Sequence, residues 1–164
     1  MQKIKNILIN TKVKKVLLIS ISIIGILIVY SKFLYPQIIQ KIFFVAETFA
    51  TLEQYDKGIN ELNKGLFFNP FDSEIYYRKG NAYALINRNK EAFNNYRIAI
   101  ILNRKNPKVY ASRSILYSTN FDFARAEFDI DKAIKLDPKN PMYYGMKATL
   151  YMVKDINKAI ELLT

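Results

Sequence analysis

Apolar residues recur three, four or seven positions apart in the second half of the chain, which is the spacing of one face of an α-helix. The first run begins at Pro107 and stops at Asn120. The second follows Asp122, a residue type that caps helix N-termini, and stops at Asp137 and Pro138. The pattern predicts two helices joined by a short turn. Their packed faces are expected to carry Tyr110, Leu116 and Tyr117 in the first helix, and Phe123, Ala126, Ile130, Ala133, Ile134 and Leu136 in the second.

The same pattern occurs again when the sequence is shifted by 34 residues. One shift upstream superposes Tyr76 on Tyr110 and Ala92 on Ala126, and a second shift gives a degenerate copy with glycine at the places of the packing alanines. Downstream, a shorter copy begins near Tyr144. The other superposed residues are Tyr83, Ala99 and Leu102 in the first upstream copy, Ile42, Phe49, Gly58, Leu62, Gly65, Phe68 and Pro70 in the degenerate copy, and Tyr151 and Ala159 in the last.

This set of positions, complete over residues 106–140, resembles one tetratricopeptide repeat, a two-helix unit of about 34 residues. A single unit cannot bury both faces of its helices, so stacked copies are needed. The resemblance implies an all-α fold, a helical-hairpin (TPR) solenoid of about 3.5 repeats within residues 37–164. The apolar segment described below is predicted to add one transmembrane helix before the solenoid. The expected repeats are residues 39–72, 73–106, 107–140 and 141–164, the last with a turn one residue shorter.

The resemblance also implies that the first helix of each repeat lines a concave groove that binds a partner protein or peptide. Members of the family that bind chaperone tails carry lysine and asparagine in the groove, and only Asn81 matches them here, so an acidic tail is not the expected ligand. Tyr77, Asn81 and Leu85 are four residues apart and form one stripe, which is expected to dominate recognition. The expected groove residues are Phe43, Glu47, Tyr77, Asn81, Leu85, Lys108, Ala111 and Ile115, with Gln40, Glu74, Met142, Gly145 and Thr149 in equivalent positions.

A long apolar segment precedes the repeats. Fifteen residues from Val16 onward carry no charge, and the apolar run continues to Tyr35 with only Lys32 interrupting it. Twenty helical residues span a hydrocarbon core of about 30 Å. Residues 16–35 are therefore predicted to form a transmembrane helix, with Tyr30 and Tyr35 as interfacial anchors. Pro36 is expected to end it.

The basic character of the chain is chiefly N-terminal. The net charge is +11, and residues 1–41 contain seven lysines and no acidic residue. Five of these lysines lie in the basic segment 1–15, whereas Lys32 and Lys41 come at or after the end of the apolar run, so the positive-inside rule predicts a cytoplasmic N-terminus and a solenoid on the extracytoplasmic side. One alternative is a cleaved secretory signal, which would release a soluble secreted or periplasmic solenoid. Another is a solenoid that binds RNA or lipid through its basic surface.

The residue types exclude most enzyme classes. The chain has no cysteine and no histidine, which removes disulfides, the usual zinc sites, cysteine nucleophiles and histidine bases. No glycine-rich phosphate loop or GxSxG motif occurs. The sequence therefore predicts no enzyme activity, no cofactor and no metal site, and it assigns most of the twelve tyrosines and eleven phenylalanines to packing between repeats. The acidic residues Asp122, Glu127, Asp129 and Asp131 are expected on a solvated convex face.

The predicted function is that of a membrane-anchored scaffold for protein–protein interaction. The C-terminal segment is expected to expose Ile160, Leu162 and Leu163 without a covering helix, which predicts self-association or partner docking at this end.

Overall fold

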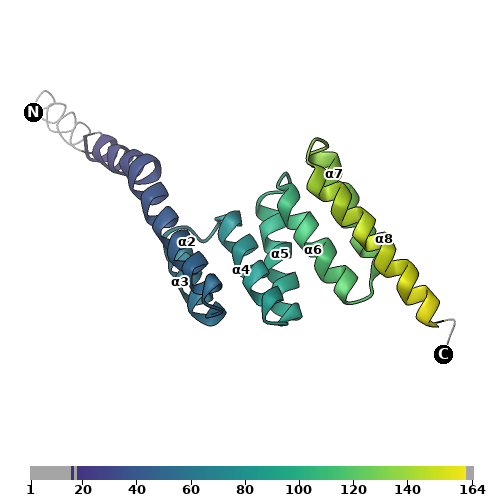
Figure 1. Cartoon of the computed structure of the whole chain (residues 1–164). Coiled ribbons are helices and arrows are strands. Elements are labelled where there is room, and N and C mark those ends of the chain that lie inside the picture. Colours follow the sequence, from purple (N-terminus) through teal and green to yellow (C-terminus); the bar gives the residue numbers. More distant parts are fainter. Residues whose placement is uncertain (1–15, 17, 162–164) are drawn as a thin grey trace, which may run out of the picture. The chain divides into compact units, whose positions relative to one another are not determined.

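The computed structural model describes residue 16 and residues 18–161, and the chain divides into two compact units, Met1–Ile42 and Phe43–Thr164. In the first unit the backbone is helical from residue 18, passes through a π-helical turn η1 (Tyr30–Leu34) and enters α2 (Tyr35–Thr51) (Figure 1). Pro36 is the second residue of α2 and lies in the first turn of that helix, and the helical backbone continues from η1 into α2. π-helical turns are rare and occur mostly as single turns inside α-helices. This one precedes Pro36, which has no N–H to donate.

The helix from Leu18 to Thr51 is long enough and apolar enough to cross a membrane, judged by length and composition. The large apolar side chains between residues 18 and 29 are exposed. The basic segment 1–15 lies outside the described residues.

In the second unit, all the regular secondary structure of the described residues is helical, as the all-α prediction requires. Successive helices pack against one another, with α4 against α5 and α6 against α7 as the closest pairs. The helices are α3 (Tyr55–Phe68), α4 (Ser73–Leu85), α5 (Asn89–Leu102), α6 (Pro107–Thr119), α7 (Phe123–Leu136) and α8 (Pro141–Glu161).

The 34-residue period of the sequence is reproduced in the backbone. The turns inside the first three helix pairs each contain one residue with positive φ, Glu53 at 58°, Asn87 at 58° and Phe121 at 60°. Three successive repeats have a tyrosine at the same position, and each tyrosine hydroxyl donates a hydrogen bond to the backbone carbonyl six residues earlier. These bonds are Tyr76 Oη to Pro70 O at 3.1 Å, Tyr110 Oη to Arg104 O at 3.3 Å, and Tyr144 Oη to Pro138 O at 3.1 Å. Equivalent residues therefore hold equivalent turns.

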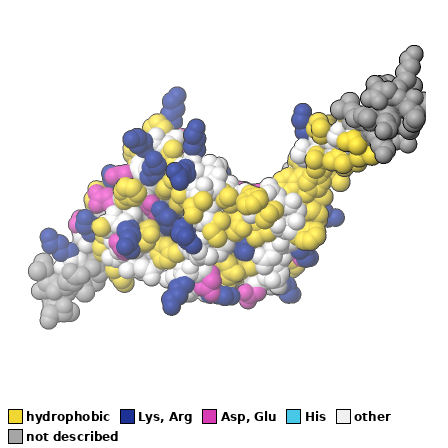
Figure 2. All heavy atoms as spheres, turned by 180° about the vertical axis from the view of Figure 1, so that it is seen from behind, with side chains coloured by type: hydrophobic (Ala, Val, Ile, Leu, Met, Phe, Trp, Pro, Cys, Tyr) yellow, Lys and Arg dark blue, Asp and Glu magenta, His cyan; other side chains and the backbone are white. Residues whose placement is uncertain are grey.

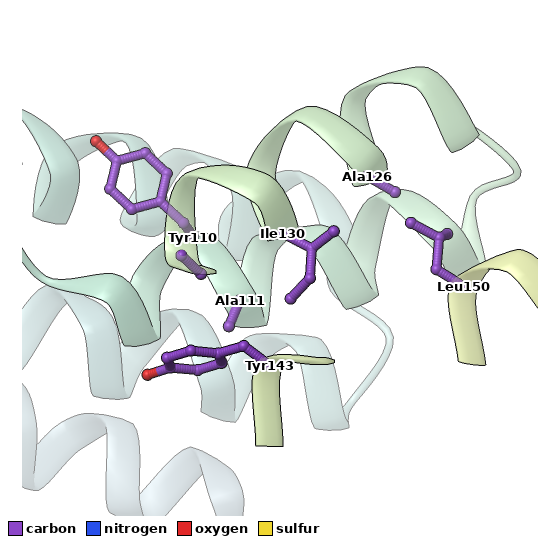
Figure 3. Packing of buried hydrophobic residues seen from close by; sticks show 7 residues of the cluster. Tyr110, Ala111, Ala126, Ile130, Tyr143 and Leu150 are labelled. Atoms are coloured by element: carbon purple, nitrogen blue, oxygen red, sulfur yellow. The ribbon is translucent and has the colours of Figure 1, made fainter. Parts of the chain in front are cut away.

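Small residues at the predicted packing positions let the helices approach closely. Ala92, Ala99, Ala126 and Ala133 have no exposed surface. Around Ala126 and Ala133 the core contains Ile130 from the same helix and large side chains from α6 and α8 (Figure 3). That cluster consists of Tyr110, Ala111, Ala126, Ile130, Ala133, Tyr143 and Leu150.

The acidic residues of α7 do not all lie on a solvated face. Asp129 is 1% exposed, and both its carboxylate oxygens accept hydrogen bonds from Arg113, from Nε at 2.6 Å and from Nη2 at 2.8 Å. The expectation for Asp129 was therefore wrong. Its position explains the burial, because it lies three residues after Ala126 and four before Ala133, on the packed face of the helix.

The expected turn in the fourth repeat is also absent. α8 runs without interruption from Pro141 to Glu161, through the positions that correspond to the earlier turns. In the third repeat the positive-φ residue Phe121 separates the two helices, and Asp122 then begins α7 by accepting a hydrogen bond from the Arg125 N–H. In the shorter register of the fourth repeat, Asp155 corresponds to Asp122, but Phe121 has no counterpart, and the backbone stays helical. The side chain of Ile160, together with Leu162 and Leu163, lies outside the described residues.

Candidate partner-binding groove

Two adjoining hollows lie along the first helices of the repeats in the second unit. The smaller, about 150 Å³, lies between α2, α3 and α4, and the larger, about 530 Å³, lies between α4, α5 and α6. Asn81 and Leu85 line both hollows, so α4 forms the wall that joins them. The two together are called the groove below. Its other lining residues are Ala46, Glu47, Ala50, Tyr55, Gly58, Leu62, Arg78 and Ala82 in the smaller hollow, and Ala84, Asn87, Asn89, Tyr96, Ser112, Ile115, Leu116 and Thr119 in the larger.

Four of the predicted groove residues line this surface, namely Glu47, Asn81, Leu85 and Ile115. Leu85 is 63% exposed and Ile115 is 52% exposed, so both present large aliphatic side chains to solvent. They come from neighbouring repeats and line the same hollow. They therefore offer a ligand a shared apolar surface.

The other four predicted groove residues have different surroundings. Ala111 is buried in the core cluster beside Tyr143, so its side chain offers no surface to a partner (Figure 3). Lys108 is exposed but lines neither hollow. Phe43 is half-buried beneath the Arg78 guanidinium, and Tyr77 is half-buried against the cluster that contains Tyr96 and Val109.

Asn81 is held by a buried tyrosine from the second helix of its own repeat. The Tyr96 hydroxyl donates a hydrogen bond to Asn81 Oδ1 at 2.8 Å. Tyr96 is only 2% exposed, and its burial raises the pKa of the phenol above the ordinary value. The Asn81 Nδ2 group donates no hydrogen bond to any described residue. The side chain is therefore fixed through its acceptor and keeps its donor for a ligand.

A glycine makes room for this arrangement. A Cβ added to Gly80 would lie 2.5 Å from Tyr96 Cε1 and 2.6 Å from Cδ1, closer than real Cβ contacts allow. The Tyr96 ring therefore lies directly across the backbone of α4 at Gly80. This close approach lets its hydroxyl reach Asn81, one residue further along.

The basic group of the groove is already paired. Arg78 Nε donates to Glu74 Oε1 at 2.9 Å, and its Nη1 lies 3.9 Å from Glu47 Oε2. The guanidinium also lies 4.2 Å from the centroid of the Phe43 ring. A ligand carboxylate would have to compete with two protein carboxylates for this one cation, which disfavours an acidic tail as the ligand.

Arg78 and Ser112 line the groove but were not among the predicted groove residues. They are 34 residues apart and so occupy equivalent positions in successive repeats. Ser112 lines the larger hollow, and its hydroxyl lies 3.5 Å from that of Tyr77. The signal was present, because each directly follows a residue, Tyr77 or Ala111, that was assigned to the groove. The helix is rotated slightly from the assumed register, which replaces buried Ala111 by Ser112 at the groove surface.

Comparison with known proteins identifies the repeats. Residues 73–106 and 107–140 match the family model described as tetratricopeptide repeat. Residues 73–140 form two tetratricopeptide repeats. The predicted solenoid fold is thereby confirmed for this part of the chain, and α3 packs onto the first of the two repeats. No curated protein matches the chain.

Solved structures of tetratricopeptide domains share the fold. The first TPR domain of human RPAP3 is 18% identical, with a TM-score of 0.68 over 76% of this chain and 98% of that one. The second TPR domain of human RPAP3, in complex with the HSP70 peptide SGPTIEEVD, is 17% identical, with a TM-score of 0.63 over 71% and 98%. The Yersinia enterocolitica type III secretion chaperone SycD, in complex with a peptide of the translocator YopD, is 13% identical, with a TM-score of 0.62 over 75% and 94%.

Proposed function

We propose that the protein is a membrane-anchored scaffold that binds a partner polypeptide in its groove. The observation that carries the proposal is the continuous surface on which Leu85 and Ile115 are exposed beside the free amide donor of Asn81. Structures of the same fold support it, because the second TPR domain of RPAP3 and the chaperone SycD hold peptides. The mechanism is recruitment, in which the groove holds a partner and the apolar helix keeps both at the membrane.

The lining of the groove indicates the chemistry of the partner. In the larger hollow the polar groups are amides and hydroxyls, from Asn81, Asn87, Asn89, Ser112, Thr119 and Tyr96. These groups suit the N–H and C=O groups of a peptide backbone, and the two aliphatic side chains suit an apolar residue of the same peptide. An uncharged segment with one large apolar side chain is therefore the proposed ligand.

The anchor of the proposed scaffold is the apolar helix that begins at Leu18. Its exposed aliphatic side chains would be covered by lipid, and the lysines of segment 1–15 favour a cytoplasmic N-terminus, with the groove on the opposite side. Alkaline carbonate is expected to leave the full chain in the membrane pellet, with an intact N-terminus by mass spectrometry. Release into the supernatant or loss of the first thirty or so residues would instead establish the cleaved form.

The groove is tested by crosslinked capture from native membranes. The test variant is Leu85→Asp with Ile115→Asp, which charges the apolar wall of the larger hollow. The matched control is Phe128→Asp, an exposed apolar residue of α7 outside the groove. Partners that survive the control and are lost with the test variant would support the proposal. Equal recovery with both variants, at equal helix content by circular dichroism, would contradict it.

A further inference from the structure

One edge of the second unit differs in chemistry from the opposite edge. Three turns connect the second helix of one repeat to the first helix of the next, at residues 69–72, 103–106 and 137–140. They occupy equivalent positions 34 residues apart, and in Figure 1 they lie along the upper side of the repeats, whereas the turns inside the repeats lie along the lower side. The edge formed by these three turns and the helix ends beside them is called the inter-repeat edge below.

The first turn of the inter-repeat edge exposes two large aromatic rings. Phe67 is 86% exposed and Phe71 is 74% exposed. Phe67 also contacts Phe68 edge-on, with ring centroids 5.6 Å apart. Rings this exposed gain little from the fold itself. Phenylalanine beside a charged surface is instead typical of segments that enter the boundary between lipid headgroups and acyl chains.

Cations occupy three of the four equivalent positions in the next two repeats, and the fourth is Ile101. In the 34-residue register, Lys105 and Lys139 correspond to Phe71, and Lys135 corresponds to Phe67. Arg104 lies beside Lys105 in the second turn. All four cations are exposed, and none forms an ion pair with a described residue. Figure 2 shows Lys and Arg side chains gathered at the upper left of the repeats, with others spread along the lower side.

The acidic groups of this edge do not neutralise its cations. Asp72 and Asp137 are half-buried and bonded within their own turns, since Asp72 Oδ1 accepts from the Glu74 N–H at 2.8 Å and Asp137 Oδ2 accepts from Asn140 Nδ2 at 3.3 Å. On the opposite edge Arg88 is paired with Glu91 and Arg125 with Asp122, and the exposed cations that form no ion pair with a described residue are Lys57 and Lys90. The inter-repeat edge therefore combines four cations that have no described ion-pair partner with the two rings Phe67 and Phe71, whereas the opposite edge has two such cations and the ring of Phe121.

We propose that the inter-repeat edge docks on an anionic lipid surface. Phe67 and Phe71 would lie at the headgroup boundary, while Arg104, Lys105, Lys135 and Lys139 would contact lipid phosphates. The charge complementarity is direct, because each lysine or arginine near an anionic surface strengthens attachment about fivefold. The inference rests on the proposed anchor in one respect, which is that the chain continues through α2 from the apolar helix into the second unit and so tethers that unit within reach of lipid. Docking would fix the orientation in which the groove meets its partner.

The absence of tryptophan from the chain allows a site-specific test. Phe71→Trp places one fluorophore on the inter-repeat edge, and Phe121→Trp places one on the opposite edge, at a residue that is 65% exposed. Each full-length variant is reconstituted into nanodiscs of phosphatidylcholine alone or with phosphatidylglycerol, with and without a lipid carrying a doxyl quencher. We expect doxyl quenching of the Phe71→Trp variant in the anionic discs, little quenching of the Phe121→Trp variant, and loss of the difference in high salt.

A matched pair of charge variants separates docking from mere proximity. Lys105→Gln with Lys139→Gln, in the Phe71→Trp background, is expected to lower the docking constant about thirtyfold. Lys57→Gln with Lys90→Gln removes the same charge from exposed residues of the opposite edge and is expected to change it less than about twofold.

Equal quenching of the Phe71→Trp and Phe121→Trp variants would overturn the proposal, as would quenching of the Phe71→Trp variant that is as strong in phosphatidylcholine as in the anionic discs. A third contrary outcome concerns the variant Lys105→Gln with Lys139→Gln. If its quenching is unchanged but it no longer crosslinks to a soluble polypeptide, the edge is a protein-binding surface and the proposal is overturned. Insertion of the apolar helix into the membrane is tested separately, by carbonate extraction of the same preparations. If the chain is released, the proposed anchor fails, and quenching by added anionic vesicles still decides the docking of the edge.

Discussion

Gly80→Ala tests the central geometric claim about the groove. The new Cβ would lie 2.5 Å from Tyr96 Cε1, and the ring has little freedom to move because it is 2% exposed and its hydroxyl is bonded to Asn81. Overpacking of a core costs about 1–3 kcal/mol. Displacement of the ring would also leave the buried hydroxyl without its acceptor, at about 1–3 kcal/mol. The gain from replacing glycine by alanine in a helix is about 1 kcal/mol.

The net effect of Gly80→Ala is therefore a loss of roughly 1–5 kcal/mol of unfolding free energy. The chain supplies its own control in Gly145, a glycine inside α8 where an added Cβ would meet nothing within 4 Å. Gly145→Ala should show the helix-propensity gain without the clash, and so should stabilise the protein by up to about 1 kcal/mol. The same substitution, glycine to alanine, is therefore expected to lower the unfolding free energy at position 80 and to raise it at position 145.

The assay is urea unfolding of the full chain in mild detergent, followed by circular dichroism. A second variant, Tyr96→Leu, removes the ring from above Gly80. Combined with Gly80→Ala, it should cost less than the sum of the two single changes, by about 1–2 kcal/mol of coupling free energy. If Gly80→Ala is as stable as the natural chain, or if the double variant is simply additive, the contact between Tyr96 and α4 is not as described and the fixed position of Asn81 loses its explanation.

Three further outcomes follow from the structure. Asp129→Asn should destabilise the repeats by about 3–5 kcal/mol because it leaves the buried Arg113 guanidinium without its carboxylate, and the test is the same urea titration. Because burial raises the pKa of Tyr96 in the folded state, stability should fall as pH rises above about 10, where the unfolded phenol ionises first, and Tyr96→Phe should lose less stability over that range. Ile156→Asp should weaken any self-association through the outer face of α8, where Ile156 and Met152 are exposed, as measured by analytical ultracentrifugation.

The period of the sequence predicts most of the fold, because each position meets the same surroundings in every repeat. Ala92 and Ala126 were placed in the core, and Asn81, Leu85 and Ile115 along the groove, from spacing and from the family resemblance that the spacing carries. The period fails where one copy departs from the others. In the fourth repeat the register is one residue shorter and the positive-φ turn residue of the earlier repeats has no counterpart, and α8 continues where the register predicts a turn.

Contacts between side chains of different helices are also not predicted by the spacing of residues along the sequence. Arg113 and Asp129 are 16 residues apart, and Tyr96 and Asn81 are 15 apart, so no local rule pairs them. A signal existed for one partner of the first pair. Asp129 interrupts an otherwise apolar stripe on the packed face of α7, and a carboxylate in such a place requires a cationic partner. Greater weight on that position would have predicted a buried ion pair instead of a solvated acidic face.

The bond from Tyr96 to Asn81 also determines how recognition should be tested. Asn81→Ala removes the acceptor of a buried hydroxyl, so it should reduce stability by about 1–3 kcal/mol, and lost binding could then follow from misfolding alone. Asn81→Asp keeps an oxygen in place for Tyr96 and replaces the free amide donor that we assign to the ligand by a carboxylate oxygen, which also adds one negative charge.

We therefore expect Asn81→Asp to unfold at nearly the same urea concentration as the natural chain, while its affinity for a captured partner peptide falls about tenfold, the effect of one lost hydrogen bond of about 1.4 kcal/mol. Isothermal titration of the full chain in nanodiscs measures both variants under one condition. If Asn81→Asp binds the peptide as tightly as the natural chain, the donor faces no ligand. Recognition would then rest on Leu85 and Ile115, whose contribution is nondirectional and would admit any apolar segment that fits between them.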